Sequence, residues 1–140
     1  MNRKIASEWT IVLRLEIGED IVASVKKTCE LHGVRAAYIT GIGALKRAVV
    51  GVFNMDTKEY KANEIVGFTE LTALCGNASV MNGESYIHLH ATLADEEGHA
   101  FGGHLNEGII GATAEIFITS LGGTIERVHC EETGLNVFDF

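Results

Sequence analysis

Residues 85–105 read SYIHLHATLADEEGHAFGGHL, and they carry the clearest structural signals of the sequence. Its polar and apolar side chains alternate, which predicts a β-strand over residues 85–94 with His88 and His90 on one face and apolar residues on the other. The tripeptide EEG that follows predicts a three-residue hairpin loop, because Gly98 supplies the left-handed residue that this kind of loop takes. The stretch therefore predicts two antiparallel strands joined by a tight turn.

The length of this loop decides which side chains meet across the hairpin. With a three-residue loop, His90 faces His104 and Thr92 faces Gly102. Residues that are directly opposed have Cβ atoms about 4.5–5.5 Å apart. His88, His90 and His104 then share one face of the hairpin, whereas a two-residue loop would turn His104 to the other face.

Three histidines on one face are a candidate metal site. Two residues that lie two apart on a strand are roughly 6.5 Å apart along the backbone, so that both imidazoles reach one ion. Three neutral imidazoles suit Zn²⁺ first, and also Fe, Ni or Cu, with at least one coordination position left open. We therefore expect a divalent transition metal on His88, His90 and His104. The alternative is a solvated sheet face, or imidazoles bonded to the backbone.

Glu115 is a second candidate for chemistry, because it interrupts the apolar run IIGATAEIFI and shares a face with Thr113 and Phe117. It is a speculative catalytic residue, either as a hydrogen-bond acceptor behind a ligating imidazole or as a general base. The alternative is an ordinary outward-facing acid. The other histidines are expected at the surface or at a helix end: His32, His99 and His129.

The rest of the chain predicts an α+β fold built on antiparallel sheet, with one main helix. Apolar residues recur at helical spacing from Ile21 to His32, Glu19 and Asp20 place negative charge in the first turn, and Gly33 is a stop signal. Strands are expected over residues 8–17, 34–42, 48–54, 69–80, 85–94, 109–121 and 124–130.

Composition limits the functional class. The length of 140 residues fits a single domain, 1–140, and 46% hydrophobic against 21% charged residues excludes intrinsic disorder. A net charge of −8 disfavours unaided binding to nucleic acid. Three cysteines without a CxxC pattern argue against a disulfide framework and a Cys-rich zinc site. Without a signal peptide or a membrane span, we expect a cytoplasmic protein that does not contact membranes.

The order of several motifs resembles a known family. These motifs are TGIGAL (40–45), ELTALCGNAS (70–79), HLHATLADEEGHAFGGHLNEG (88–108), TAEIFI (113–118) and ETGL (132–135). The chain resembles the plants-and-prokaryotes conserved domain, the predicted DNA-binding module that follows AT-hooks in plant AT-hook nuclear proteins. The resemblance implies a strongly bent antiparallel sheet, a homotrimer and a regulatory role. In stand-alone prokaryotic members the histidines of the HxH and GGH motifs look like a metal site, which corresponds to His88, His90 and His104.

Two functional hypotheses follow from the resemblance. The first is a trimeric assembly module with a three-histidine metal site, which acts near DNA through protein partners. Direct DNA contact is disfavoured, because the AT-hook needs an Arg-Gly-Arg-Pro core and this sequence contains no proline. The second is a small metal-dependent enzyme, lyase or hydrolase-like, in which the ion polarises a carbonyl or activates water. The fold and the three histidines are also similar to those of acetolactate decarboxylase, a metal-dependent enzyme.

Overall fold

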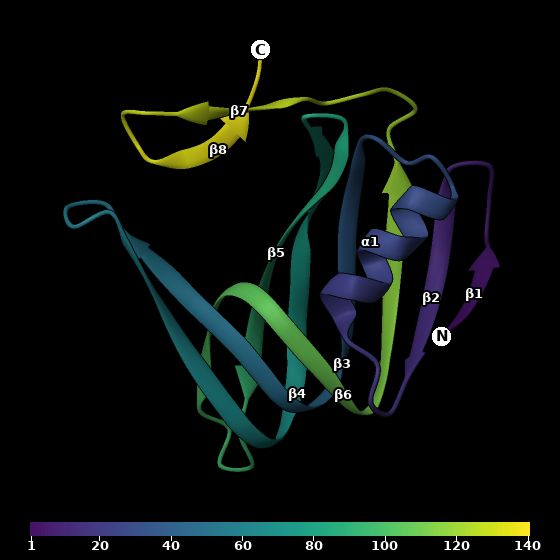
Figure 1. Cartoon of the computed structure of the whole chain (residues 1–140). Helices are drawn as coiled ribbons and strands as arrows, with labels where there is room; N and C mark the ends of the chain where they lie inside the picture. Colours follow the sequence, from purple (N-terminus) through teal and green to yellow (C-terminus); the bar gives the residue numbers. More distant parts are fainter.

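A computed structural model describes residues 1–140 as a bent antiparallel sheet, one helix and a small C-terminal hairpin (Figure 1). The predicted α+β class, with one helix on antiparallel sheet, is confirmed. The elements in chain order are β1 (Asn2–Ile5), β2 (Thr10–Glu16), α1 (Ile21–Leu31), β3 (Ala37–Asn54), β4 (Glu59–Met81), β5 (Glu84–Ala94), β6 (Ala100–Ser120), β7 (Arg127–Cys130) and β8 (Leu135–Phe138).

Six of the strands form one sheet in the order β1-β2-β6-β3-β4-β5, and β6 also pairs with β5. The first residues of β6 pair with β5 and its remainder pairs with β3, so that this part of the sheet closes on itself. The register of β3 against β4 shifts between Gly41 and Gly43 and again between Leu45 and Arg47. Such irregularities bend a strand without ending it. The two strands expected over residues 34–42 and 48–54 are therefore one continuous strand.

Helix α1 begins and ends at residues that the sequence marked. Asp20 is the N-cap, and its side chain accepts a hydrogen bond of 2.7 Å from the backbone N–H of Ala23. The first turn itself contains no acid, so Glu19 and Asp20 precede this turn rather than lie in it. At the other end, Gly33 has a φ of +63°, as expected for a helix stop. Ile21 and Val25 are fully buried in a core cluster of 23 residues, which fixes α1 on one face of the sheet. The helix is not long and apolar enough to cross a membrane.

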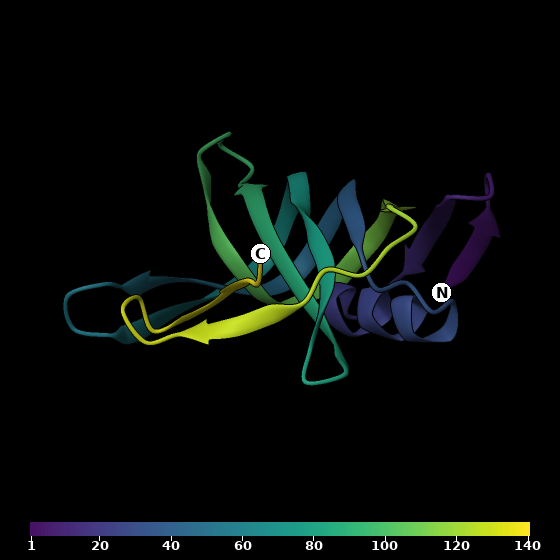
Figure 2. The same ribbon diagram turned by 90° about the horizontal axis from the view of Figure 1, so that it is seen from above.

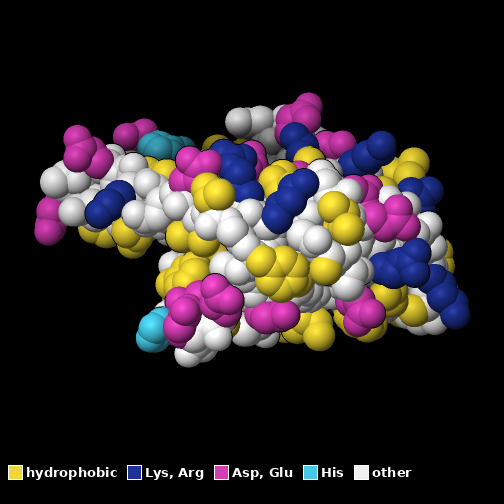
Figure 3. Space-filling view, turned by 90° about the horizontal axis from the view of Figure 1, so that it is seen from below, with side chains coloured by type: hydrophobic (Ala, Val, Ile, Leu, Met, Phe, Trp, Pro, Cys, Tyr) yellow, Lys and Arg dark blue, Asp and Glu magenta, His cyan; other side chains and the backbone are white.

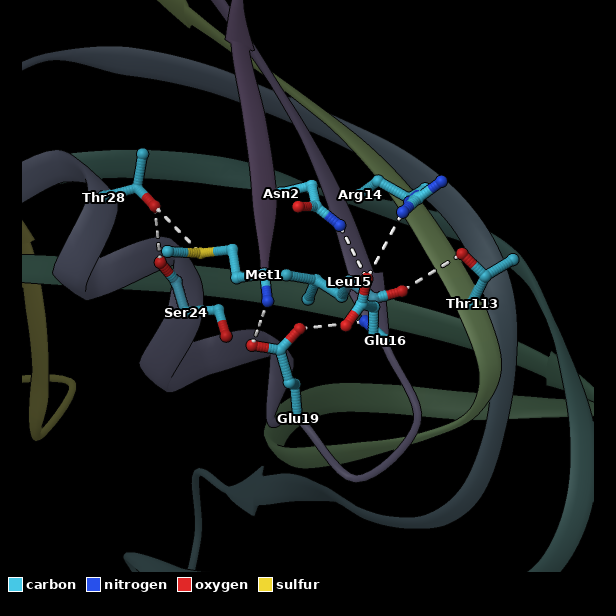
Figure 4. A network of polar contacts seen from close by, with 9 residues as sticks. All are labelled: Met1, Asn2, Arg14, Leu15, Glu16, Glu19, Ser24, Thr28 and Thr113. Carbon is cyan, nitrogen blue, oxygen red and sulfur yellow. Dashed lines mark hydrogen bonds and ion pairs between the residues drawn. The ribbon is translucent and has the colours of Figure 1, made fainter.

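Polar contacts tie β1 and β2 to the helix (Figure 4). The amino group of Met1 lies 2.6 Å from Glu19 Oε1, and the other Glu19 oxygen accepts a hydrogen bond of 2.9 Å from the backbone N–H of Glu16. The Met1 sulfur lies 3.6 Å from the Thr28 hydroxyl. Strand β1, which the sequence did not predict, is thus the edge strand of the sheet, and the residue before it contacts α1.

The C-terminal hairpin formed by β7 and β8 lies beside the hairpin that joins β3 to β4 (Figure 2). The Lys58 ammonium near the tip of the β3–β4 hairpin donates a hydrogen bond of 2.8 Å to the carbonyl oxygen of Glu132. A Cβ added to Gly134 would lie 3.3 Å from the Phe53 ring, so the two hairpins are in close contact. The strand expected over residues 124–130 corresponds to β7, whereas β8 was not predicted.

Candidate metal centre

The β5–β6 hairpin has the predicted register. His90 pairs directly with His104 across the hairpin. The loop closes with a hydrogen bond of 3.0 Å from the backbone N–H of Gly98 to the Asp95 carbonyl oxygen, and Gly98 has a φ of +84°. The three-residue loop is therefore confirmed, together with the placement of His104 on the face of His90.

The three imidazoles converge on one point. One candidate ligand atom from each of His88, His90 and His104 lies within 4.8 Å of the other two. The Nε2 atoms of His88 and His90 are 3.3 Å apart. Two nitrogens on a tetrahedral Zn²⁺, each at about 2.0–2.1 Å from the ion, are separated by about 3.3–3.4 Å. The spacing of this pair therefore fits a shared metal ion without rearrangement.

The protonation state of the cluster also favours a metal. Burial lowers the pKa of His88 to about 4, and the charges of His104, Arg127 and His90 lower it further in the same direction. Burial, followed by the charge of His90, also lowers the pKa of His104. Neutral imidazoles carry the free lone pair that a metal ion needs. The donor set therefore fits a divalent transition metal at neutral pH.

Glycines let three strands meet beside the histidines. A Cβ at Gly103 would lie 2.6 Å from the carbonyl oxygen of Gly51 on β3, and a Cβ at Gly102 would collide with the carbonyl oxygen of Ala91 on β5. Strand β6 can thus contact β3 and β5 at once only because it lacks side chains here. The ring of His104, the next residue, lies edge-on to the ring of Tyr60 at a centroid distance of 6.0 Å.

The histidines lie in the wall of a cavity of about 810 Å³. One side of this cavity is the β3–β4 hairpin, which contributes Val52, Phe53 and Tyr60, and the opposite side is the C-terminal hairpin seen above it in Figure 1. From the C-terminal hairpin come Arg127 and the whole of β8. A small molecule in this cavity would contact the imidazoles directly.

The structure does not bring Glu115 to this cavity. Glu115 is exposed and lines a different hollow, together with Ile42 and Phe68 on the outer face of the sheet. Its partner on β3 is Ile42, whereas the partner of His104 on β3 is Gly51, nine residues further along the strand. Within this chain, Glu115 therefore does not reach the three imidazoles.

The remaining histidines lie outside the cluster, as expected. His32 is the C-cap of α1, and His99 pairs with Asp95 in the hairpin loop at 3.1 Å. On the C-terminal hairpin, the Nδ1 atom of His129 lies 3.1 Å from the side-chain oxygen of Asn136.

Three further residues line the cavity that no pattern in the sequence indicated, namely Arg127, Tyr60 and Asn77. Arg127 contacts Asn77 across 50 positions of sequence. No local spacing reveals such a contact, and only the docking of β7 beside β4 brings the two residues together.

Comparisons with known proteins define the family. Residues 4–122 match the model of the Plants and Prokaryotes Conserved (PCC) domain. The chain belongs to the PCC domain family. Among curated proteins, it is 30% identical over 108 residues to the bifunctional protein GlmU of a Synechococcus strain, a match that covers 76% of this chain and 16% of that protein. The chain thus spans only a small part of this relative.

Three solved structures match this chain over almost its whole length and over almost the whole of their own. A proposed DNA-binding protein from Bacteroides thetaiotaomicron is 29% identical with a TM-score of 0.96, over 99% of this chain and 96% of that one. A PPC protein from Pyrococcus horikoshii is 37% identical, with a TM-score of 0.87 over 99% and 95%. A metal-containing protein from Archaeoglobus fulgidus is 31% identical, with a TM-score of 0.89 over 100% and 99%. The three histidines of this chain therefore lie in a fold that it shares with a metal-containing protein.

A weaker similarity confirms the predicted architecture. Acetolactate decarboxylase from Bacillus subtilis is 14% identical with a TM-score of 0.59, over 87% of this chain and 57% of that one. At this level of identity the two proteins share the fold.

Proposed function

We propose that this PCC domain is a metalloprotein that binds one divalent transition metal, Zn²⁺ first, through His88, His90 and His104. The observation that carries the proposal is the convergence of three imidazoles, with 3.3 Å between the Nε2 atoms of His88 and His90. The metal-containing relative from Archaeoglobus fulgidus, 31% identical, supports it. Three histidines are three of the four ligands of a tetrahedral zinc site, which leaves one position for water or a small molecule from the cavity.

The test is the metal content of the protein purified without a histidine tag. We expect about one ion per chain in the wild type, and loss of that ion in His88→Ala and in His104→Ala. His32→Ala is the matched control, because His32 caps α1 through its backbone and lies outside the cluster, so this variant keeps its metal. Full metal content in His104→Ala contradicts the site, as does a wild type that takes up no Zn²⁺, Fe²⁺ or Ni²⁺.

We also propose that the chain assembles as a homotrimer through the outer face of the sheet. This face exposes large apolar side chains, namely Tyr38, Ile42, Phe68 and Phe117, at 45–60% of their surface. Contiguous apolar surface of this kind is typical of interaction sites. Glu115 shares a hollow with Ile42 and Phe68, so the proposed interface would include it.

Light scattering after gel filtration tests the trimer. We expect a mass three times the chain mass of 15.1 kDa for the wild type, and a smaller species for Phe68→Glu. Phe140→Glu introduces the same change at a side chain that is 99% exposed at the C-terminus, and it should leave the mass unchanged. A monomeric wild type would refute the assembly.

For the regulatory role of this module we propose protein partners rather than direct contact with DNA. On the face shown in Figure 3, Lys and Arg side chains are interspersed with Asp and Glu, and the net charge is −8. Binding to DNA phosphates requires a positive surface, and it weakens steeply as salt rises. Gel retardation at low salt should therefore show no complex with duplex DNA, and a salt-sensitive complex would contradict this proposal.

A metal-dependent enzyme is the second candidate, and the cavity favours it. A purely structural metal does not need an open cavity of about 810 Å³ against its ligands. A bound metal would supply Lewis-acid chemistry, in which it polarises a carbonyl group or a water molecule. The test is turnover of small carbonyl compounds by the metal-loaded protein. Activity that His104→Ala abolishes and His32→Ala retains would support the enzyme, whereas equal rates in all three proteins would refute it.

A further inference from the structure

Arg127 is a buried cation in the wall of the histidine cavity. Its Nε donates a hydrogen bond of 2.7 Å to the Ser79 hydroxyl. Its Nη1 donates one of 2.6 Å to the Asn136 carbonyl oxygen, and its Nη2 donates one of 2.9 Å to the Asn77 side-chain oxygen. All three acceptors are neutral, so these bonds orient the guanidinium group without compensating its charge.

No carboxylate pairs with this charge. Arg127 is only 9% exposed, and each ion pair in the structure uses other groups. The rings of Tyr86 and Phe138 lie against it, with 4.7 Å and 4.4 Å from the guanidinium carbon to the ring centroids. Burial, which disfavours the charged form, lowers the pKa of Arg127. Buried charges in proteins are normally paired, so an anion bound in the cavity would compensate the charge of Arg127.

The guanidinium group lies next to the histidines. Asn77, which accepts its Nη2 bond, is the direct partner of His88 across strands β4 and β5. Directly opposed residues have Cβ atoms about 4.5–5.5 Å apart, so one side chain separates the cation from the imidazole cluster. One small molecule can therefore contact both.

The donors left on Arg127 suit a carboxylate. An arginine has five N–H donors, and because the Nε donor and one on each terminal nitrogen are used, one remains on Nη1 and one on Nη2. Planar guanidinium groups recognise carboxylates through such paired donors, which a lysine ammonium does not reproduce. The cavity walls around Arg127 are largely apolar, and their residues include Phe53, Leu135 and Val137.

We propose that this cavity binds a small organic monocarboxylate, with the carboxylate on Arg127 and an apolar body against the two hairpins that form its walls. The contact of the ligand with a metal on the histidines rests on the proposed function above. The contact with Arg127 does not, because it needs only the guanidinium group and the cavity. Arg127 is therefore the residue that selects an acid over its neutral analogue.

Calorimetric titration of the wild type with benzoate and with benzamide tests this assignment, in metal-free and Zn²⁺-loaded protein. The two probes have the same ring, and only benzoate is charged. Charge-assisted hydrogen bonds are among the stronger ones in proteins, so we expect benzoate to bind at least tenfold more tightly than benzamide in both forms. Equal affinities for the two probes would overturn the proposal, and so would equally effective competition by inorganic phosphate, which has no apolar body.

A matched pair of variants locates the contact. Arg127→Lys keeps the charge but loses the planar donors, and it should weaken benzoate binding at least tenfold while benzamide binding stays the same. Arg14→Lys makes the same change at an exposed arginine outside the cavity and should bind benzoate like the wild type. Undiminished benzoate binding in a folded Arg127→Lys protein overturns the proposal. If this variant does not fold, the comparison of benzoate with benzamide in the wild type still decides.

The metal analysis separates this proposal from the proposed function. Selective benzoate binding by a protein that takes up no metal supports the Arg127 site and refutes the metal centre. A protein that holds one ion per chain on the histidines but does not distinguish benzoate from benzamide supports the metal centre and refutes the Arg127 site.

Discussion

Leu89 lies between His88 and His90 in sequence and points to the opposite face, where it is 1% exposed in the core cluster. Replacing it with alanine should destabilise the domain without removing a ligand. Leu→Ala substitutions in cores cost roughly 2–5 kcal/mol, depending on how far the site can collapse. The partner of Leu89 on β4 is Gly76, which has no side chain to fill the space. We therefore expect the upper part of the range, about 3–5 kcal/mol.

This loss translates into a large shift of the melting temperature. The unfolding entropy is roughly 2.1 cal/mol/K per residue, which gives about 0.3 kcal/mol/K for a chain of 140 residues. A loss of about 3–5 kcal/mol then lowers the melting temperature by about 10–17 °C. Urea unfolding of the metal-free protein at one fixed protein concentration measures the loss, because assembly makes apparent stability depend on concentration.

The matched control is Leu31→Ala at the end of α1, where the leucine is 56% exposed. The free energy of unfolding should change there by no more than about 0.5 kcal/mol. Below its melting temperature, Leu89→Ala should still bind one metal ion per chain, because the histidines project from the other face. A loss below about 1 kcal/mol for Leu89→Ala, or an equal loss for Leu31→Ala, would refute the assignment of the two faces of β5.

Three further predictions concern the helix cap, the cysteines and the hairpin loop. Asp20→Ala removes the N-cap of α1 and should lower the free energy of unfolding by about 1–2 kcal/mol in urea. Asp20→Asn should lose less, because its one amide oxygen can still accept from Ala23 but no longer also from Gly108. Iodoacetamide at mildly alkaline pH should modify Cys130, because hydrogen bonds with Thr133 lower the pKa of its thiol. It should spare Cys29, because burial raises the pKa of that thiol to about 12. Peptide mass mapping checks which cysteine is modified. Gly98→Val forces a φ of +84° on a β-branched residue and should lower the free energy of unfolding by about 1–3 kcal/mol. Gly123→Val is the control, because Gly123 lies in open space without a positive φ, and it should leave the free energy of unfolding nearly unchanged in the same urea assay.

The β5–β6 hairpin could be predicted because its signals are local. Side chains alternate over residues 85–94, and a glycine stands at the loop position that requires a left-handed backbone. Since a one-residue change of register moves every side chain to the other face, the loop length alone placed His104 beside His90. The helix could also be predicted from the sequence, because its apolar residues recur at helical spacing and Gly33 marks its end.

Strand β3 shows why continuity is harder to predict than pairing. Glycines and two adjacent basic residues interrupt its apolar pattern between residues 41 and 47, which suggested two separate strands. In the structure the chain continues through two shifts of register, and the charge at Arg47 is held by Glu64, 2.7 Å away on β4, and by Glu107 on β6. Because these partners are distant in sequence, an interruption in the pattern could not be distinguished from the end of a strand.

The walls of the cavity were out of reach for the same reason. Arg127 lies in a short strand whose local pattern is unremarkable, and its role depends on contacts with Asn77, Ser79 and Tyr86 that form only when the C-terminal hairpin docks. Glu115 illustrates the opposite error. An acid in an apolar strand suggested chemistry, yet the sheet places it on the outer face among exposed apolar side chains.

The most direct test of the metal centre is anomalous diffraction from crystals of the protein loaded with Zn²⁺, recorded on both sides of the zinc absorption edge. We predict one strong anomalous peak per chain, at about 2.0–2.1 Å from one ring nitrogen of each of His88, His90 and His104. A peak held by other residues, or three histidines with no anomalous peak between them at saturating zinc, would contradict the account.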